Sequence, residues 1–434
     1  MNLEECGLKS HHRLHLIMNK TIISILLIIT VGAPLFIGPN IYSVFDLSKI
    51  TFVYILTFIL IGVWAVRGTV PQMNTLTYPI LAVLFSSIIA TVFAIHPFVS
   101  FAGTYKRYGG LMSLVVYMVL FFAVVEFVKK SDIQKFINAV IITASVAAVY
   151  SLIQYTNLDP YDWSIDFGYD GRPSSTFGHP TFMGAYMAMT VPLVIYGIMK
   201  GEYWLYPIVG LLMYALFLSK TRSGFIGLVV AIIFFFALYK RKSYKVLVPV
   251  LVALLALSVY MPNSPVKRFI AEYKEWNMEG NIGYRVQMAN TCLDIAKDNY
   301  IVGIGMDNLA YKYSEYYQKR YKKDSDRYNN RAHNAILEIL VTQGIIGLLA
   351  WLSLFIFYFK LVYENKENLI IISLSSGVVA YMVQNMFTFS GPGIAPLFWI
   401  LMGLTIVQAK KDYDFEVVHH PDGYTLGDTY NIKV

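Results

Sequence analysis

The chain has 434 residues and a formal net charge of +8; 56% of its residues are hydrophobic, only 14% are charged, and its mean hydropathy is +0.54. This composition excludes an ordinary soluble domain, in which charged residues make up about a quarter of the chain. It indicates an integral membrane protein, and we expect no nucleic-acid partner.

Apolar runs recur along nearly the whole chain, each long enough to cross a hydrocarbon core of ~30 Å, which takes about 20 residues. A membrane β-barrel would instead alternate polar and apolar residues over short segments. The predicted fold is therefore all-α, a polytopic transmembrane helical bundle. About twelve spans are predicted, near residues 21–38, 48–66, 76–95, 111–128, 136–154, 180–198, 203–219, 223–240, 244–261, 335–359, 368–388 and 394–409.

This pattern divides the chain into four parts. Residues 1–261 carry the first nine predicted spans, 262–334 form one large loop, 335–409 carry the last three spans, and 410–434 form a tail. We interpret the first run as an uncleaved anchor, because Ala33 is followed by Pro34 and no small-residue cleavage site is present. Cys6 and Cys292 lie far apart and predict no disulfide.

Lysine and arginine predict the orientation, because short loops that carry them stay on the cytoplasmic side. With the N-terminus inside and twelve spans, sixteen of these residues fall in the cytoplasmic segments as far as Lys411 and six fall in the short outer loops. Segment 262–334 falls outside, where its length exempts it from the rule. Both termini are therefore expected inside.

The six basic residues in outer loops stand where such residues are least expected. Each could extend to phospholipid headgroups, and for a single residue that interpretation is as good as a functional one. Most of them, however, abut helix ends on the same outer face as Arg285, Arg331 and His333. Such a cluster suits an anionic group, since arginine binds phosphate through paired N–H groups. The six are Lys49, Lys106, Arg107, Arg172, Lys220 and Arg222.

The large outer loop carries a predicted amphipathic helix in the stretch GYRVQMANTCLDIAKDNY. Arg285 lies at its start, where backbone N–H groups favour anions. The G-x-G that follows the helix has no preceding strand and is too weak a signal to indicate nucleotide binding. The apolar residues that share one face at helical spacing are Val286, Ala289, Leu293 and Ala296.

A tyrosine-rich stretch with many charges follows, from Tyr311 to Tyr328. Tyrosines in such a place are more often an interfacial belt than a sugar-stacking platform, which stays open as the lesser alternative. Within it, Asp324 and Asp326 have the D-x-D spacing by which metal-dependent glycosyltransferases hold a nucleotide sugar. Neighbouring basic residues explain these acids more simply, and we expect no metal or other cofactor.

The segment NRAHNAILEIL, residues 330–340, places Arg331, His333 and Asn334 directly before an apolar helix. The positive end of that helix, together with Arg331, should disfavour imidazolium and keep His333 able to accept a proton. Glu338 lies one turn further on and could pair with an arginine or orient the loop. His333 could equally be a helix-end residue satisfied by a backbone carbonyl, and position alone leaves the two interpretations even.

A resemblance to a known family rests on four segments: GRPSSTFGHPTFMGAYMAM, SKTRSG, YRVQMANTCLDIAKDNYIVGIGMDN and RAHNAILEILVTQGIIGLL. They resemble the O-antigen ligase and O-antigen polymerase family of multispanning membrane glycosyltransferases, over about residues 100 to 404. The most specific part is an outer-loop arginine followed by G-x-G and then H-N-x-x-L-E before a span. The family often has a proline shortly before the G-x-G, where this chain has Tyr300.

The resemblance implies a GT-C-like enzyme of the bacterial cytoplasmic membrane that works without a metal. It would move a glycan from an undecaprenyl diphosphate carrier to a hydroxyl acceptor on the outer face. Arg222 and Arg285 match the family arginines that hold the diphosphate, and His333 matches the catalytic histidine. Further candidates for substrate binding are Arg107, Arg172, Lys220, Arg331, Asn334 and Glu338.

The acceptor stays open within this family. A ligase passes the glycan to a lipid A core, a polymerase passes it to another carrier-linked unit, and a protein O-oligosaccharyltransferase passes it to serine or threonine. A transporter of lipid-linked glycans is least favoured. Its ionisable residues would line the bilayer midplane, whereas here the charges gather at one face.

Overall fold

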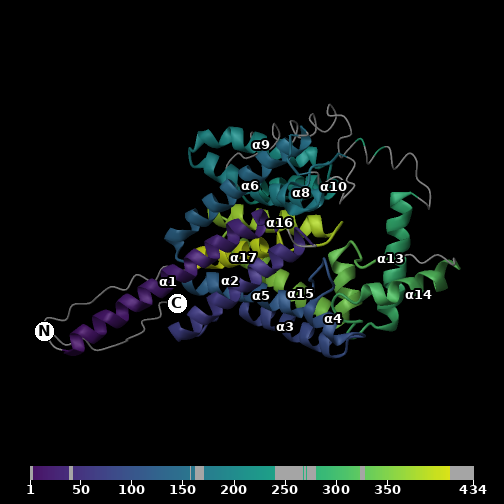
Figure 1. The fold of residues 1–434 in the computed structure, drawn as a ribbon, viewed down its shortest axis with the longest axis horizontal. Coiled ribbons are helices and arrows are strands. Elements are labelled where there is room, and N and C mark those ends of the chain that lie inside the picture. Colours follow the sequence, from purple (N-terminus) through teal and green to yellow (C-terminus); the bar gives the residue numbers. More distant parts are fainter. Residues whose placement is uncertain are drawn as a thin grey trace.

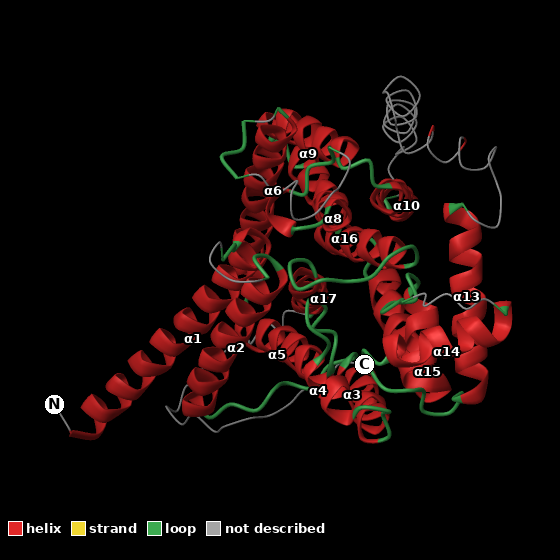
Figure 2. Ribbon diagram, turned by 45° about the vertical axis from the view of Figure 1, so that its right-hand side comes forward, coloured by secondary structure: helices red, strands yellow, loops and turns green. Residues whose placement is uncertain are grey.

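The computed structural model describes residues 3–38, 43–156, 158–161, 171–239, 280–322 and 328–410, together with Lys267 and Ile270. Throughout these ranges the regular elements are helices, and no strand occurs among them (Figure 2). The predicted all-α fold is confirmed for this part of the chain. The predicted span 244–261 and the tail beyond Lys410 lie outside the described residues.

Most of the α-helices follow apolar runs of the sequence. Three 3₁₀ turns lie among them: η1 (Lys130–Asp132), η2 (Ser175–Phe177) and η3 (Tyr203–Leu205). In chain order the helices are α1 (Leu3–Leu35), α2 (Asp46–Arg67), α3 (Thr77–Val92), α4 (Pro97–Ala102), α5 (Leu111–Phe127), α6 (Ile133–Tyr155), α8 (Pro180–Met199), α9 (Tyr206–Leu218), α10 (Arg222–Leu238), α13 (Asn281–Asp298), α14 (Leu309–Tyr321), α15 (Ala335–Glu364), α16 (Leu369–Asn385) and α17 (Ala395–Ala409).

Several of these helices are apolar, and some of them are also long enough to cross a membrane. Six apolar helices are too short to be counted as spans by length, but they coincide with predicted spans: α3, α5, α10, α16, α17, and α9 with η3. The chain is therefore a helical membrane protein, while the number of its spans and the side on which 262–334 lies stay predictions. The described helices that are long and apolar enough to cross a membrane are Arg13–Leu35, Asp46–Arg67, Lys130–Tyr155, Pro180–Met199 and Ala335–Glu364.

The bundle packs around α8 and α16, most of whose side chains are buried. Helix α16 lies against α8, α10 and α17, while α5 packs on α17 and α3 on α15 (Figure 1). Peripheral helices turn apolar side chains outward: Phe58 of α2, Phe85 of α3 and Ile356 of α15 are 52%, 66% and 66% exposed. Apolar faces of this extent are what a lipid-facing surface requires.

Helix α15 is broken at Gly344, which the apolar run over 335–359 did not predict. Gly344 has φ +66° and ψ −165°, and a Cβ there would stand 2.2 Å from the carbonyl oxygen of Ile301, so the position requires glycine. The break frees two carbonyls of α15, which accept the N–H groups of Ile304 and Gly305 at 3.0 and 2.9 Å. The loop before α14 is thereby hydrogen-bonded to α15.

Helices α13 and α14 and the first part of α15 form a small second core at one end of the molecule (Figure 1). The predicted helix is confirmed as α13, but its predicted apolar face is only partly correct: Ala296 is buried in the second core. Val286 and Leu293 are 39% and 43% exposed, whereas Met288, Cys292 and Ile295 are buried. Contact with α14 and α15 selects the buried face, which helical spacing cannot do when several faces carry apolar residues.

The tyrosine-rich stretch lies in α14 as far as Tyr321, and this helix packs into the second core. Tyr313 and Tyr317 are fully buried, with 6.0 Å between their ring centroids, and the Tyr317 hydroxyl donates to Gln287 Oε1 at 2.9 Å. An interfacial belt is therefore the wrong interpretation for these two residues. Tyr311, by contrast, stays half exposed.

Candidate active site

Loops from six parts of the chain meet at the end of the bundle that carries α13 and α14: residues 103–110, 171–179, 219–221, 302–308, 330–334 and 386–394. Backbone with positive φ in non-glycine residues gathers at functional sites, where surrounding contacts enforce it. Seven described non-glycine residues have positive φ. Six of them lie in these loops: Lys106, Tyr108, Ser175, Lys220, Asp307 and His333.

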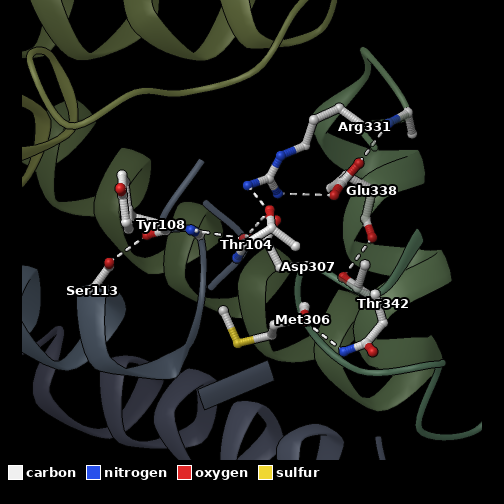
Figure 3. Close-up of polar contacts among 11 residues, drawn as sticks. Thr104, Tyr108, Ser113, Met306, Asp307, Arg331, Glu338 and Thr342 are labelled. Atoms are coloured by element: carbon white, nitrogen blue, oxygen red, sulfur yellow. Dashed lines mark hydrogen bonds and ion pairs between the residues drawn. The ribbon is translucent and has the colours of Figure 1, made fainter. Parts of the chain in front are cut away.

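Arg331 lies at the centre of a buried ion-pair network (Figure 3). Its guanidinium contacts Asp307 Oδ1 at 2.5 Å and Glu338 Oε1 at 3.1 Å, and its side chain is only 10% exposed. The second oxygen of Glu338 accepts the N–H of Ala332 at 2.6 Å. Because two carboxylates face one guanidinium, this predicted binding residue is engaged in holding the loop before α15.

Asp307 extends the network to the loop before α5. Its Oδ2 accepts the N–H groups of Thr104 at 2.7 Å and Gly109 at 3.1 Å, 203 and 198 residues away along the chain. Gly109 approaches Arg331 so closely that a Cβ would stand 2.2 Å from a terminal guanidinium nitrogen. The loop that carries Arg107 is therefore positioned by the same network.

His333 is held by both of its neighbours. The preceding Ala332 is bonded to Glu338, and the following Asn334, the N-cap of α15, donates to the carbonyl of Met386 at 3.1 Å. Between them His333 has φ +50°, in the left-handed region. This turn brings the imidazole to the loop between α16 and α17.

Phe389, in that loop, is the residue around which the site is built. The His333 ring meets it edge-on, with 5.2 Å between centroids and 75° between planes. The Arg107 guanidinium lies over the Phe389 ring at 4.4 Å from its centroid. Phe182, in the first turn of α8, packs against Phe389 at 5.5 Å. One phenyl ring thus brings together an arginine, a histidine and the start of α8.

His179, the N-cap of α8, joins the site through Phe182, whose ring lies 5.4 Å away. Its Nδ1 accepts the N–H of Thr181 at 3.0 Å. A neutral imidazole that accepts at Nδ1 carries its proton on Nε2, so this nitrogen is a hydrogen-bond donor. Sequence analysis missed this residue, although Pro180 is a signal: proline favours the first helical position and so marks residue 179 as the N-cap.

Arg172 holds the short turn between α9 and α10. Its Nε donates to the carbonyl of Ser219 at 2.8 Å, and a terminal nitrogen contacts Thr221 Oγ1 at 3.4 Å. Thr221 Oγ1 in turn donates to the carbonyl of Pro180 at 3.3 Å. The turn is therefore fixed beside the first residue of α8.

The other predicted residues lie at the start of α10, in the turn before it, and on α13. Arg222 is the half-buried first residue of α10, and Lys220 precedes it in the turn. Arg285, in the second turn of α13, is exposed and donates to the carbonyl of Phe387 at 3.0 Å. Arg285 is thereby tied to the loop that carries Phe389, whereas Arg222 and Lys220 lie beside the start of α8.

Burial and neighbouring charge keep both histidines neutral. The pKa of His333 is lowered from 6.5 to about 4, first by burial and then by the charges of arginines, chiefly Arg285 and Arg107. The pKa of His179 is also lowered to about 4, again first by burial, with Arg172 as the largest charge effect. Two uncharged imidazoles thus lie in a positive potential, which favours an anionic ligand.

Residues 207–352 match the family model described as O-antigen ligase. This match covers part of the chain and supports an assignment to the O-antigen ligase family. It confirms the resemblance noted in the sequence, and with the apolar helices it supports a membrane glycosyltransferase of the ligase or polymerase type, acting in polysaccharide biosynthesis. Comparison with curated proteins gives no match.

The O-antigen ligase match covers only part of the site. Arg285 and His333 lie inside the matched range, whereas Arg107, His179 and Phe389 lie outside it and reach the same place through the fold. No group of three or more metal-ligating side chains gathers among the residues that the structure describes. The D-x-D stretch lies outside those residues, so metal independence stays a prediction.

Proposed function

We propose that this O-antigen ligase family protein transfers a glycan from an undecaprenyl diphosphate carrier to the hydroxyl group of an acceptor. The observation that carries the proposal is the pair of neutral histidines set among Arg107, Arg172 and Arg285. Guanidinium groups suit a diphosphate, because their N–H groups match its oxygens in pairs. A neutral imidazole suits the removal of a hydroxyl proton.

In the proposed step, the acceptor oxygen attacks the anomeric carbon of the sugar that is linked to the diphosphate. A glycosidic C–O bond forms while the bond from this carbon to the diphosphate oxygen breaks, and the bonding electrons leave with the diphosphate. His333 takes the hydroxyl proton. Arg222 and Arg285 hold the departing diphosphate, whose growing negative charge they stabilise, and His179 donates its Nε2–H to the same group.

The remaining candidates have supporting roles in this proposal. Arg331, Glu338 and Asn334 position the loop that carries His333, as their contacts to one another, to Asp307 and to the loop after α16 support. The set that adds positive charge around the diphosphate is Arg107, Arg172 and Lys220.

We propose the outer face of the bacterial cytoplasmic membrane as the side of the site. The opposite end of the bundle carries lysines typical of cytoplasmic loops: the side chains of Lys135 and Lys360 are 64% and 66% exposed, and Lys410 donates to the carbonyl of Val125 at 2.9 Å. Reporter fusions after Pro262 and after Lys411 test this orientation. Activity of a cytoplasm-only reporter at the first position would contradict it.

Purified protein given the carrier-linked glycan and an acceptor tests the chemistry. Transfer should continue in excess EDTA, because arginines instead of a metal ion stabilise the negative charge of the departing diphosphate. Transfer that stops in EDTA, returns with Mg²⁺ or Mn²⁺ and is abolished by Asp324→Ala with Asp326→Ala would replace this mechanism with a metal-dependent one.

The surface glycans of a strain that lacks this protein distinguish between the three possible acceptors. Full-length chains that stay on the carrier would indicate a ligase, and products limited to a single repeat would indicate a polymerase. Loss of glycan from a protein, with lipid-linked chains otherwise normal, would indicate a protein O-oligosaccharyltransferase.

A further inference from the structure

A cavity of about 160 Å³ lies directly beneath the site, between α5, α15, α16 and α17. Arg107 lines it, and Ser390, next to Phe389, lines it as well, so the cavity and the site share a wall. Its other walls are strongly aromatic. The aromatic residues that line it are Tyr108, Tyr117, Trp351, Tyr381 and Trp399.

The cavity lies within the first few turns of the bundle at the site end. Tyr117 is in the second turn of α5 and Trp399 is in the second turn of α17. Trp351 is seven residues beyond the break at Gly344, about two helical turns. The break in α15 therefore decides that an indole, sixteen residues beyond the start of the helix, lines a cavity next to the site.

Two polar atoms in the cavity walls are left over. Trp351 Nε1 and the Tyr108 hydroxyl are buried and have no hydrogen-bond partner among the described residues. The neighbouring hydroxyls are engaged: Ser113 donates to the carbonyl of Tyr108 (Figure 3), and Tyr381 donates to Ser390 at 2.5 Å. A buried polar group without a hydrogen-bond partner is unfavourable, so these two atoms are suited to pair with the hydroxyl groups of a ligand.

We propose that this cavity binds one pyranose ring, the sugar linked directly to the diphosphate; this inference rests on the proposed function. An engineered cavity of similar size in another protein, ~150 Å³, holds one six-membered ring. The apolar C–H faces of a pyranose pack on aromatic rings, and its hydroxyls can pair with the indole N–H and the phenol. An isoprene unit of the carrier would leave both polar atoms without partners.

The position of Arg107 selects which sugar is bound. Arg107 lines the cavity, and its guanidinium lies over Phe389 in the site, where the diphosphate is proposed to lie. A ring in the cavity is therefore next to the proposed position of the diphosphate. The cavity makes the first sugar of the glycan a determinant of donor specificity.

Binding of two probes to the full-length protein in detergent tests this inference. One probe is undecaprenyl diphosphate alone; the other is the native carrier-linked glycan extracted from a strain that lacks this protein. Trp351→Phe keeps an aromatic ring but removes the N–H. It should weaken binding of the carrier-linked glycan by about 2- to 10-fold and leave binding of undecaprenyl diphosphate unchanged. Ala395→Phe, which puts a ring into the cavity from α17, should weaken it by about tenfold or more.

Leu349→Phe is the matched control, because Leu349 is 59% exposed on the outside of α15 and should leave both probes unchanged. Equal weakening of both probes would overturn the inference and place the carrier's first isoprene in the cavity. Unchanged binding of both probes by both cavity variants, with the proteins folded, would exclude the cavity as a ligand site. Wild-type protein that binds neither probe would overturn the proposed function itself.

Discussion

Arg331 and Arg285 lie at the same end of the molecule, and both lower the pKa of His333, yet their surroundings differ. Arg331 is buried and contacts two carboxylates, Asp307 and Glu338. Arg285 is exposed and donates to a neutral backbone carbonyl. Arg107 likewise lies against a neutral phenyl ring. The first arrangement neutralises charge inside the protein, while the contacts of the second leave positive potential at the histidines.

This difference separates residues that build the site from residues that are suited to bind a substrate. A buried guanidinium faced by two carboxylates stabilises one conformation, and removal of one partner leaves the remaining buried charges uncompensated. The charges of Arg107 and Arg285 act on His333, whose pKa they lower, and under the proposed function the same charges bind the diphosphate. Comparison of the two sets should therefore give opposite outcomes for stability and for activity.

The largest effect is expected at His333. His333→Asn should lower the rate of transfer by about 10²- to 10⁴-fold, the usual contribution of a general base. Asparagine suits the left-handed φ of this position, so the melting temperature should change little. Transfer by membranes that contain equal amounts of each protein is the measurement. A normal rate would favour a histidine satisfied as a helix-end residue.

Arg331→Met sharpens the comparison from the structural side. It should lower the free energy of unfolding by about 3–5 kcal/mol, because two buried carboxylates lose their common partner. Thermal or denaturant unfolding in detergent measures this change. Arg285→Met is the control and should change stability by about 0.5 kcal/mol or less, since its side chain is exposed. Similar losses in both variants would break the distinction between the two arginines.

His179 tests whether the start of α8 binds an anion or only caps the helix. Asp and Asn are both good N-caps, so His179→Asp and His179→Asn should fold. Only aspartate adds a negative charge, and it should raise the KM for the carrier-linked donor by about 10- to 100-fold. His96→Asp, at the N-cap of α4, is the control. Equal KM values for the two His179 variants would indicate a capping role alone.

A smaller loss of activity is expected when lysine replaces arginine, because this change keeps the positive charge and alters only the shape of the cation. Arg222→Lys and Arg285→Lys should each lower kcat/KM by about tenfold, because lysine cannot offer paired N–H groups to a diphosphate. Lys135→Arg, at the opposite end of the bundle, is the control. Full activity with lysine at both positions would mean that charge alone suffices.

The smallest effect is expected from pH within the neutral range. With a pKa of about 4, His333 stays neutral down to about pH 5, so transfer should be flat from pH 8 to 5.5 and fall only as the pH approaches 4. Stability should decrease as the pH falls from 6.5 toward 4, since the unfolded chain binds protons there that the two buried histidines do not. A fall in the transfer rate with its midpoint near pH 6.5 would show that burial and the neighbouring arginines do not lower the pKa of His333.

Local patterns in the sequence were enough to predict most of the helices in the described part of the chain. The predicted runs 48–66 and 180–198 correspond to Asp46–Arg67 and Pro180–Met199, because an apolar run of sufficient length favours a helix wherever it occurs. The structure brings Arg107, Arg285 and His333 together around the loop that carries Phe389, while their roles in substrate binding and catalysis stay predictions.

Only the tertiary structure decided which charges are neutralised and which side chains meet. Arg331 and Arg107 look equivalent in the sequence, yet the partner Asp307 comes from a distant loop and only one of the two arginines contacts it. The break at Gly344, the buried face of α13 and the position of Phe389 likewise depend on contacts between segments far apart in the chain. Hydrophobic periodicity reports which residues avoid water, whereas pairing between distant side chains is set by packing, which no local pattern encodes.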